Sequence, residues 1–152
     1  MTMQMAVAIS LGLAAAVEDI ARRRISNWIP VVALTAGVVT LSIERGWRGA
    51  LSSVGGALGG FLVFLIFYCL GGMGGGDVKL MAGLGAVVGV EHLVEAALWT
   101  AGLGGLLAGL CVALAALKGL WNGASGGSRR VESIPYAPAI ALGSWLALLP
   151  KT

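Results

Sequence analysis

Residues 71–80 read GGMGGGDVKL, so that one carboxylate, Asp77, follows a run of glycines and lies between two strongly apolar segments. Glycine permits positive φ angles and close backbone approach. A carboxylate this near hydrocarbon is energetically expensive and by default indicates a functional site, whereas an acid in an exposed interhelical loop is merely solvated. The choice between these interpretations depends on whether a second acid lies at the same membrane depth.

The composition predicts an all-α, polytopic membrane protein in a single domain, residues 1–152. Apolar residues make up 58% of the chain and charged residues 11%, against about 25% charged in soluble domains. No polar stretch is long enough for a sizeable soluble domain. The formal net charge of +3 does not indicate a nucleic-acid partner, because the few basic residues lie at the ends of apolar segments, where they set membrane topology.

Six apolar segments are predicted as membrane-crossing helices. They are 3–20, 28–43, 50–70, 78–90, 93–117 and 135–149. The fourth is short, since roughly 13 residues at about 1.5 Å each give about 20 Å, against a hydrocarbon core of about 30 Å. Either this helix continues past Glu91 and His92, or its Asp77 end starts below the membrane surface.

Charge predicts the orientation of these segments. With the N-terminus outside, the cytoplasmic side holds seven basic residues and the external side three, as the positive-inside rule requires. The cytoplasmic set is Arg22, Arg23, Arg24, Lys79, Lys118, Arg129 and Arg130, and the external set is Arg45, Arg48 and Lys151. Trp28 and Trp121 then fall near the inner interface and Trp47 near the outer one, as in an aromatic belt. The 118–133 stretch is the expected cytoplasmic loop.

Several residues are expected to serve the fold rather than the chemistry. Small-xxx-small pairs predict close helix packing; they are Gly55/Gly59, Gly56/Gly60 and Gly105/Gly109. Cys69 and Cys111 are expected to be buried small hydrophobes, not a disulfide or a metal pair. His92 is expected to be solvated in an external turn with Glu91 and Glu95, the alternative being a ligand or a base.

The predicted topology puts two acids at one level. Asp19 ends the first helix and Asp77 opens the fourth, and both of these ends lie at the cytoplasmic face. Two close carboxylates cannot both ionise easily and therefore share a proton. One can then take a proton from water while the other gives one to a peptide carbonyl oxygen, which is aspartic-protease chemistry and needs neither a metal nor a cofactor.

Glu18 competes with Asp19 for this role. Adjacent helical residues point about 100° apart, so only one of the two is expected to face Asp77. The spacing alone does not decide which of them does.

Three stretches resemble the type IV prepilin peptidases, which are intramembrane aspartyl proteases. Residues 74–80, GGGDVKL, are similar to the family's G-x-G-D-x-K-L motif. Asp19, a few residues before the 25–28 run ISNW, resembles its first catalytic aspartate, although Ser26 stands where a proline is usual. Residues 134–143, IPYAPAIALG, resemble its last helix. The resemblance covers most of the chain.

The resemblance implies that Asp19 and Asp77 are the catalytic pair. Gly74 and Gly76 would let the loop bend so that Asp77 faces Asp19. Lys79 would tune the acids or contact substrate backbone, unless it is an ordinary positive-inside anchor.

Two more residues are assigned supporting roles. Asn27 is expected to cap the second helix and to shape the site only indirectly. Glu18 would add to an acidic patch that attracts a basic leader.

The resemblance also implies a substrate and a place. The substrate would be a prepilin with a basic leader, a glycine before the cut and an apolar helix in the bilayer, cleaved at the cytoplasmic face of the bacterial inner membrane. The chain looks like the short members that serve tight-adherence (Flp) pili, because it lacks the paired cysteines of the longer, methylating members. Methylation and oligomeric state are left open.

Two other functions remain as alternatives. A small proton-coupled transporter or channel could use the same acids as a proton relay, but it should show repeated halves and a site near the midplane. An inactive scaffold subunit of a pilus secretion machine is the other alternative. A pilin-like reading frame nearby would favour the peptidase over both.

Overall fold

The structure is a computed structural model that describes residues 2–22, 24–71, 73–121 and 136–149, without the side chains of 115–121. The described residues form five helices, which confirms the all-α prediction. They are α1 (Met3–Arg22), α2 (Trp28–Cys69), α3 (Gly75–Val88), α4 (Val90–Trp121) and α5 (Ala137–Ala147). The predicted loop 118–133 lies outside the described residues from residue 122 onward, as do Arg23, Gly72 and Lys151.

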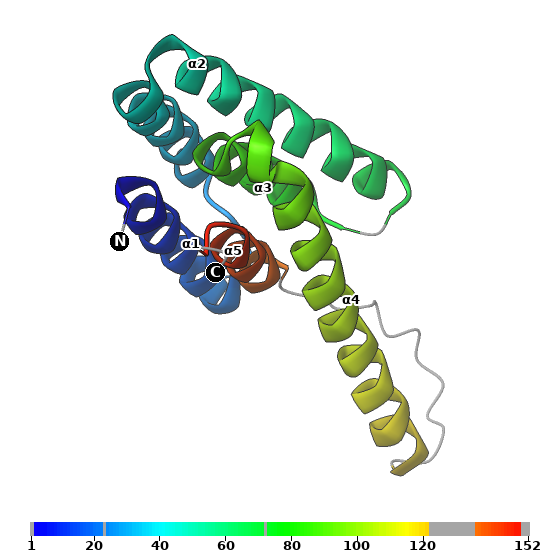
Figure 1. The fold of residues 1–152 in the computed structure, drawn as a ribbon. Helices are drawn as coiled ribbons and strands as arrows, with labels where there is room; N and C mark the ends of the chain where they lie inside the picture. The colour runs from blue at the N-terminus through cyan, green and yellow to red at the C-terminus, as the bar shows by residue number, and fades with distance from the viewer. Residues whose placement is uncertain (1, 23, 72, 122–135, 150–152) are drawn as a thin grey trace.

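Helix α2 is a hairpin of two helical arms. Gly46 has φ 63° and ψ −147°, a non-helical conformation inside an otherwise continuous 42-residue helix. Residues with a Cβ rarely adopt a positive φ, so glycine allows the reversal. The two arms correspond to the predicted segments 28–43 and 50–70, and Figure 1 shows them folding back at the top of the molecule. The predicted polar connection 44–48 is helical on both sides of Gly46.

Helix α3 lies among all the other helices and contacts each of them. Its backbone packs directly against both arms of α2. A Cβ added to Gly37 of the first arm would lie 2.5 Å from the Ala86 carbonyl carbon, and one added to Gly60 of the second arm would lie 2.7 Å from the Met81 carbonyl oxygen. Gly56 approaches the carbonyl oxygen of Gly85 in the same way. The predicted close packing at Gly56 and Gly60 is therefore confirmed.

The fourth predicted segment ends earlier than expected. Helix α3 stops at Val88, and Gly89, with φ 78°, turns the chain directly into α4. The alternative in which this helix continues past Glu91 and His92 is therefore wrong. The prediction of an external turn at these residues is also wrong, because they lie in the first turn of α4.

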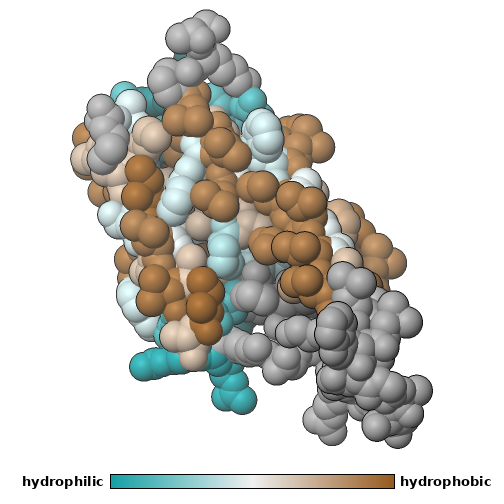
Figure 2. Space-filling view, turned by 90° about the horizontal axis from the view of Figure 1, so that it is seen from below, coloured by the Kyte–Doolittle hydropathy of each residue, from teal (hydrophilic) through white to brown (hydrophobic). Residues whose placement is uncertain are grey.

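Among the residues that the structure describes, three helices are long and apolar enough to cross a membrane: α1, α2 and the 90–114 part of α4. Helix α2, with 42 residues, has about twice the roughly 20 residues that one crossing needs. Large apolar side chains are exposed along these helices, including Leu58, Ile66 and Leu106. Figure 2 shows hydrophobic residues over the middle of one face and hydrophilic residues toward two ends.

Two predictions about the apolar segments are wrong. Cys69 and Cys111 are free thiols but exposed rather than buried. Gly105 and Gly109 have no neighbour among the described residues within 4 Å of an added Cβ. Helix α4 instead packs through Gly104, where an added Cβ would lie 3.2 Å from the Tyr136 ring.

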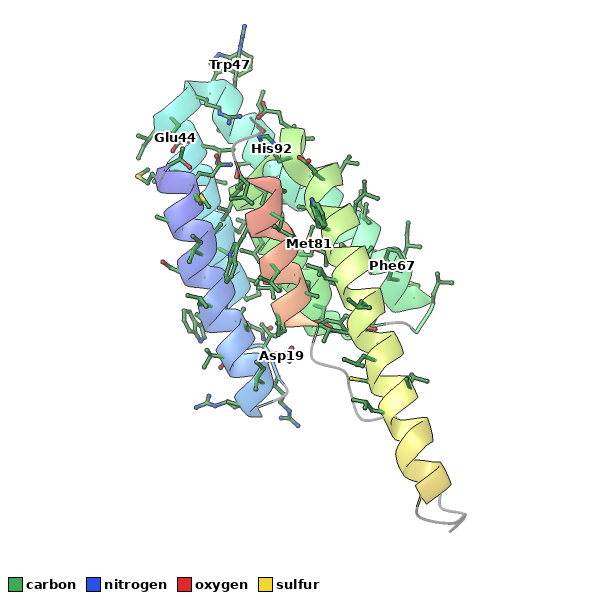
Figure 3. All side chains as sticks on the ribbon, turned by 60° about the horizontal axis from the view of Figure 1, so that its bottom comes forward. Asp19, Glu44, Trp47, Phe67, Met81 and His92 are labelled. Atoms are coloured by element: carbon green, nitrogen blue, oxygen red, sulfur yellow. The ribbon has the colours of Figure 1, made fainter. Side chains whose placement is uncertain are left out.

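The molecule has two polar ends. Figure 3 labels Asp19 at one end of the bundle and Glu44, Trp47 and His92 at the other. At the second end, Arg45 of α2 forms an ion pair with Glu91 of α4. Asp19 is thus separated from these charged groups by the apolar length of the helices.

Close backbone packing predicts the effect of adding a methyl group. Gly60→Ala should destabilise the protein by about 1–3 kcal/mol, because the new Cβ overpacks the α2–α3 contact. Gly105→Ala is the matched control, and it should be neutral or slightly stabilising because alanine is the better helix former. Thermal unfolding in mild detergent measures both, and equal midpoints would contradict this packing argument.

Candidate active site

Asp19 lies in the last turn of α1, against the start of α5. Its Oδ2 accepts a hydrogen bond of 3.1 Å from the backbone N–H of Ala137, the first residue of α5. The first four N–H groups of a helix have no partner within the helix, so the carboxylate satisfies one of them. Asp19 is only 7% exposed.

Asp77 lies in the first turn of α3 and is 8% exposed. Its Oδ2 accepts a hydrogen bond of 3.1 Å from the backbone N–H of Gly74, which precedes the helix. Its own N–H donates to the Gly74 carbonyl at 3.1 Å. This is the reach-back geometry of an acid at the third helical position, and it fixes the Asp77 side chain at the helix start.

The two aspartates come together where α1, α3 and α5 meet. These three helices contact one another pairwise, and Ile25, in the connection that follows α1, lies 3.5 Å from the position of an added Cβ on Gly76, the residue before Asp77. Among the described residues, one oxygen of each carboxylate accepts a backbone hydrogen bond and the other oxygen accepts none. The arrangement therefore offers two buried, neighbouring carboxylates, each with one oxygen left for water or substrate.

Glu18 is held differently from its neighbour. Its Oε1 accepts a 2.5 Å hydrogen bond from Ser26 Oγ, and its Oε2 accepts one of 3.1 Å from the Ser26 N–H. Arg22 adds an ion pair of 3.6 Å. Both Glu18 oxygens are thus engaged by the α1–α2 connection, while Asp19 bonds to α5, so the structure separates the two acids that the sequence left as competitors.

Asn27 does not cap α2, and this prediction is wrong. No hydrogen bond joins its side chain to the start of that helix. Its Oδ1 instead accepts a 3.0 Å hydrogen bond from Nζ of Lys79 in α3. Asn27 and Lys79, which were predicted to have separate supporting roles, therefore form a hydrogen bond with each other.

Gly74 and Gly76 do not act through positive φ angles. Gly74 has φ −81° and ψ 152°, and Gly76 is part of the first turn of α3. An added Cβ at Gly74 would lie 3.3 Å from Asp77 Oδ2, which is a tight contact, whereas one at Gly76 would lie at an ordinary contact distance of 3.5 Å from Ile25 Cβ. Among the described residues of this loop, Gly71 has a positive φ, of 75°.

A groove of about 340 Å³ lies between α3 and both arms of α2. Helix α3 lines it with Lys79, Ala82 and Gly83, and the arms add mostly apolar residues such as Leu34 and Phe61. Neither aspartate lines it, so this groove is separate from the paired carboxylates.

Sequence reasoning missed two contributors to the site. The 134–143 run was matched to a last helix, but no role was given to Ala137, whose N–H holds Asp19. Ser26 was noted only as a departure from the usual proline, although it holds Glu18 through both of its donors. The helix-initiating prolines around Ala137 were the available signal for the first, and no pattern in the sequence indicated the second.

Metal binding has no support in the described part of the chain. No cluster of three or more His, Cys, Asp or Glu side chains that could hold an ion occurs there.

Comparison with known proteins gives a family and one curated relative. The pattern of the type IV leader peptidase family matches residues 6–109. The chain is 35% identical over 146 residues to a Bacillus subtilis (strain 168) protein named prepilin leader peptidase/N-methyltransferase. That alignment covers 94% of this chain and 54% of the relative, so the chain spans about half the length of the relative. No solved structure matches the chain.

The hydrogen bond to α5 predicts a difference between two substitutions of Asp19. Asp19→Ala should destabilise the protein by about 1–3 kcal/mol, because the buried Ala137 N–H loses its acceptor. Asp19→Asn keeps an acceptor oxygen and should stay close to the parent. Thermal unfolding in detergent compares them, and equal losses for both variants would show that the carboxylate is not holding α5.

Proposed function

Because the chain belongs to the type IV leader peptidase family, we propose that it is an intramembrane aspartic endopeptidase with Asp19 and Asp77 as its catalytic pair. The observation that carries the proposal is the burial of these two carboxylates, 7% and 8% exposed, on the contacting helices α1 and α3. Buried acids in apolar surroundings are costly and are retained where they serve a function.

The proposed reaction divides the work between the two acids. The ionised carboxylate takes a proton from a water molecule, whose oxygen attacks the carbonyl carbon of the scissile peptide bond. The protonated carboxyl group gives its proton to the carbonyl oxygen, and the attack of water together with this proton transfer forms a tetrahedral intermediate. Proton transfer to the leaving nitrogen then breaks the C–N bond, and the free carboxyl and amino ends separate.

Two backbone donors would keep the pair ready for this reaction. The N–H groups of Ala137 and Gly74 each hold one oxygen of a carboxylate at 3.1 Å. Each acid is thereby restricted in rotation, and its other oxygen can be presented to water or to the peptide. Such preorganisation lowers the cost of reaching the reactive geometry.

The proposed substrate is a prepilin of the Flp type, with a basic leader and an apolar helix in the bilayer. The relative's name supports a prepilin substrate. A basic leader would be attracted by the acids at this end of the molecule. The proposal covers peptide cleavage, and methyl transfer is left open.

We further propose six crossings of the bacterial inner membrane, with the N-terminus outside and the site toward the cytoplasm. The crossings are α1, the two arms of α2, α3, α4 and α5. Helix α3 has 14 residues, which gives about 21 Å, and therefore does not fill a hydrocarbon core of about 30 Å. Gly89 turns the chain from α3 directly into α4 at the Glu91 end. The length that α3 lacks for a full crossing is therefore expected at its Asp77 end.

Cleavage of a co-expressed Flp-type prepilin, read as a band shift, tests the catalytic pair. Asp19→Asn and Asp77→Asn should each lose activity by about 10²–10⁴-fold or more, as expected when a general acid or base is removed. Glu44→Gln is the matched control, because it makes the same change at the opposite end of the molecule. Near-parental cleavage by either aspartate variant would remove that residue from the pair.

Cysteine labelling tests the proposed orientation. In a Cys69→Ser, Cys111→Ser background, a membrane-impermeant maleimide should label Trp47→Cys in intact cells, because Trp47 is 70% exposed at the outer end. Arg24→Cys should be labelled only after the inner membrane is opened. The reverse pattern would place the aspartates outside and contradict a cytoplasmic cleavage site.

A further inference from the structure

The connection between α1 and α2 carries two polar contacts in series. Glu18 in α1 holds Ser26 through both carboxylate oxygens, at 2.5 and 3.1 Å. The next residue, Asn27, accepts a 3.0 Å hydrogen bond from Lys79 in α3. We call Glu18, Ser26, Asn27 and Lys79 the polar bridge.

The polar bridge begins beside one aspartate and ends beside the other. Glu18 precedes Asp19 in α1, and Lys79 follows Asp77 by two residues in the first turns of α3. Ile25, in the same connection, packs 3.5 Å from the position of an added Cβ on Gly76. Residues 25–27 of this connection therefore contact the helical turns that carry the two aspartates.

We propose that the polar bridge sets the separation of the two aspartates, so that Glu18, Ser26, Asn27 and Lys79 are positioning residues. This inference rests on the proposed function of Asp19 and Asp77. None of the four is assigned a contact with the reacting atoms, because the oxygens of Glu18 are engaged by Ser26 and the Lys79 ammonium by Asn27. They act by holding together the helical turns that carry Asp19 and Asp77.

The location of these contacts favours a role in positioning the two aspartates over a role in the stability of the whole fold. Lys79 and Asn27 meet at an exposed hydrogen bond, and the Glu18–Ser26 contact is only partly buried. The main core lies elsewhere, among residues such as Leu80, Leu84 and Ile140. Losing an exposed polar contact should therefore change the global fold little, while a small shift of catalytic groups is costly in rate.

The first test is steady-state cleavage of a prepilin by Ser26→Ala, Lys79→Met and the double variant. Each single variant should lower kcat on the order of tenfold, as expected for a small misplacement of reacting groups, and should leave KM within about twofold and the thermal midpoint near the parent. Ser26→Ala removes the hydroxyl bond to Glu18 and keeps the backbone one, whereas Lys79→Met removes the hydrogen bond to Asn27. Because the contacts lie in series, Lys79→Met releases the bridge by itself, and the double variant should be no slower than Lys79→Met. Fully multiplicative losses would overturn this arrangement.

Two further variants distinguish positioning from a general loss of polarity. Ser10→Ala is the matched control, since it removes a serine hydroxyl that donates to the Ala6 carbonyl in the same helix, and it should retain parental kcat. Ser26→Thr keeps a hydroxyl donor and should recover most of the activity lost in Ser26→Ala. A rise in KM alone for Lys79→Met would indicate a substrate contact and overturn the positioning role.

A second measurement reports the separation without catalysis. Asp19→Cys and Asp77→Cys, combined with Cys69→Ser and Cys111→Ser, are treated in membranes with a short bifunctional methanethiosulfonate, and the cross-link is quantified by mass spectrometry. Adding Ser26→Ala should reduce the cross-link several-fold, and adding Ser10→Ala should not. Cross-linking unchanged by Ser26→Ala overturns the polar bridge alone, whereas no cross-link in the starting protein overturns the aspartate pair as well.

Discussion

The enclosure of α3 between the two arms of α2 is the constraint on which the rest of the structure depends. Gly37, Gly56 and Gly60 let the arms meet the α3 backbone directly, with no side chain between them. Such contacts leave little freedom for α3 to slide or rotate, because any shift brings backbone atoms into collision. The position of Asp77, in the first turn of this helix, is therefore fixed by packing that begins at Met81, about one turn away.

Asp19 is fixed by a different set of contacts. Helix α1 is attached to α3 at the far end, where Gln4 donates to the Val87 and Val88 carbonyls at 2.7 and 3.1 Å. It is attached to α5 along its length, where Trp145 Nε1 donates to the Ala8 carbonyl at 2.9 Å. At the other end of α1, Asp19 accepts the hydrogen bond from the Ala137 N–H of α5. Each acid thus belongs to a helix that is held at more than one level.

Much of this could be predicted from the sequence, and the rest could not for physical reasons. The all-α class and the apolar segments follow from composition and local pattern, and the same pattern singles out Asp77 as a candidate. The partner of Asn27 could not be foreseen, because capping is a local preference while the contact with Lys79 joins residues 52 positions apart. The conformations of Gly74 and Gly76 could not be foreseen either, because a run of glycines does not show which of them adopts a positive φ, and neither of these two does.

The exposure of Cys69 and Cys111 could not be predicted from local pattern either. Apolar periodicity in a membrane segment does not separate a lipid-facing side from a buried one, since both are hydrophobic. Lipid is as apolar as the helix surface, so apolar burial gives helices little reason to prefer one register over another. Register must then come from close backbone contact and from polar groups that need partners. In this protein the glycines supply the first, and Gln4, Asp19 and the polar bridge supply the second.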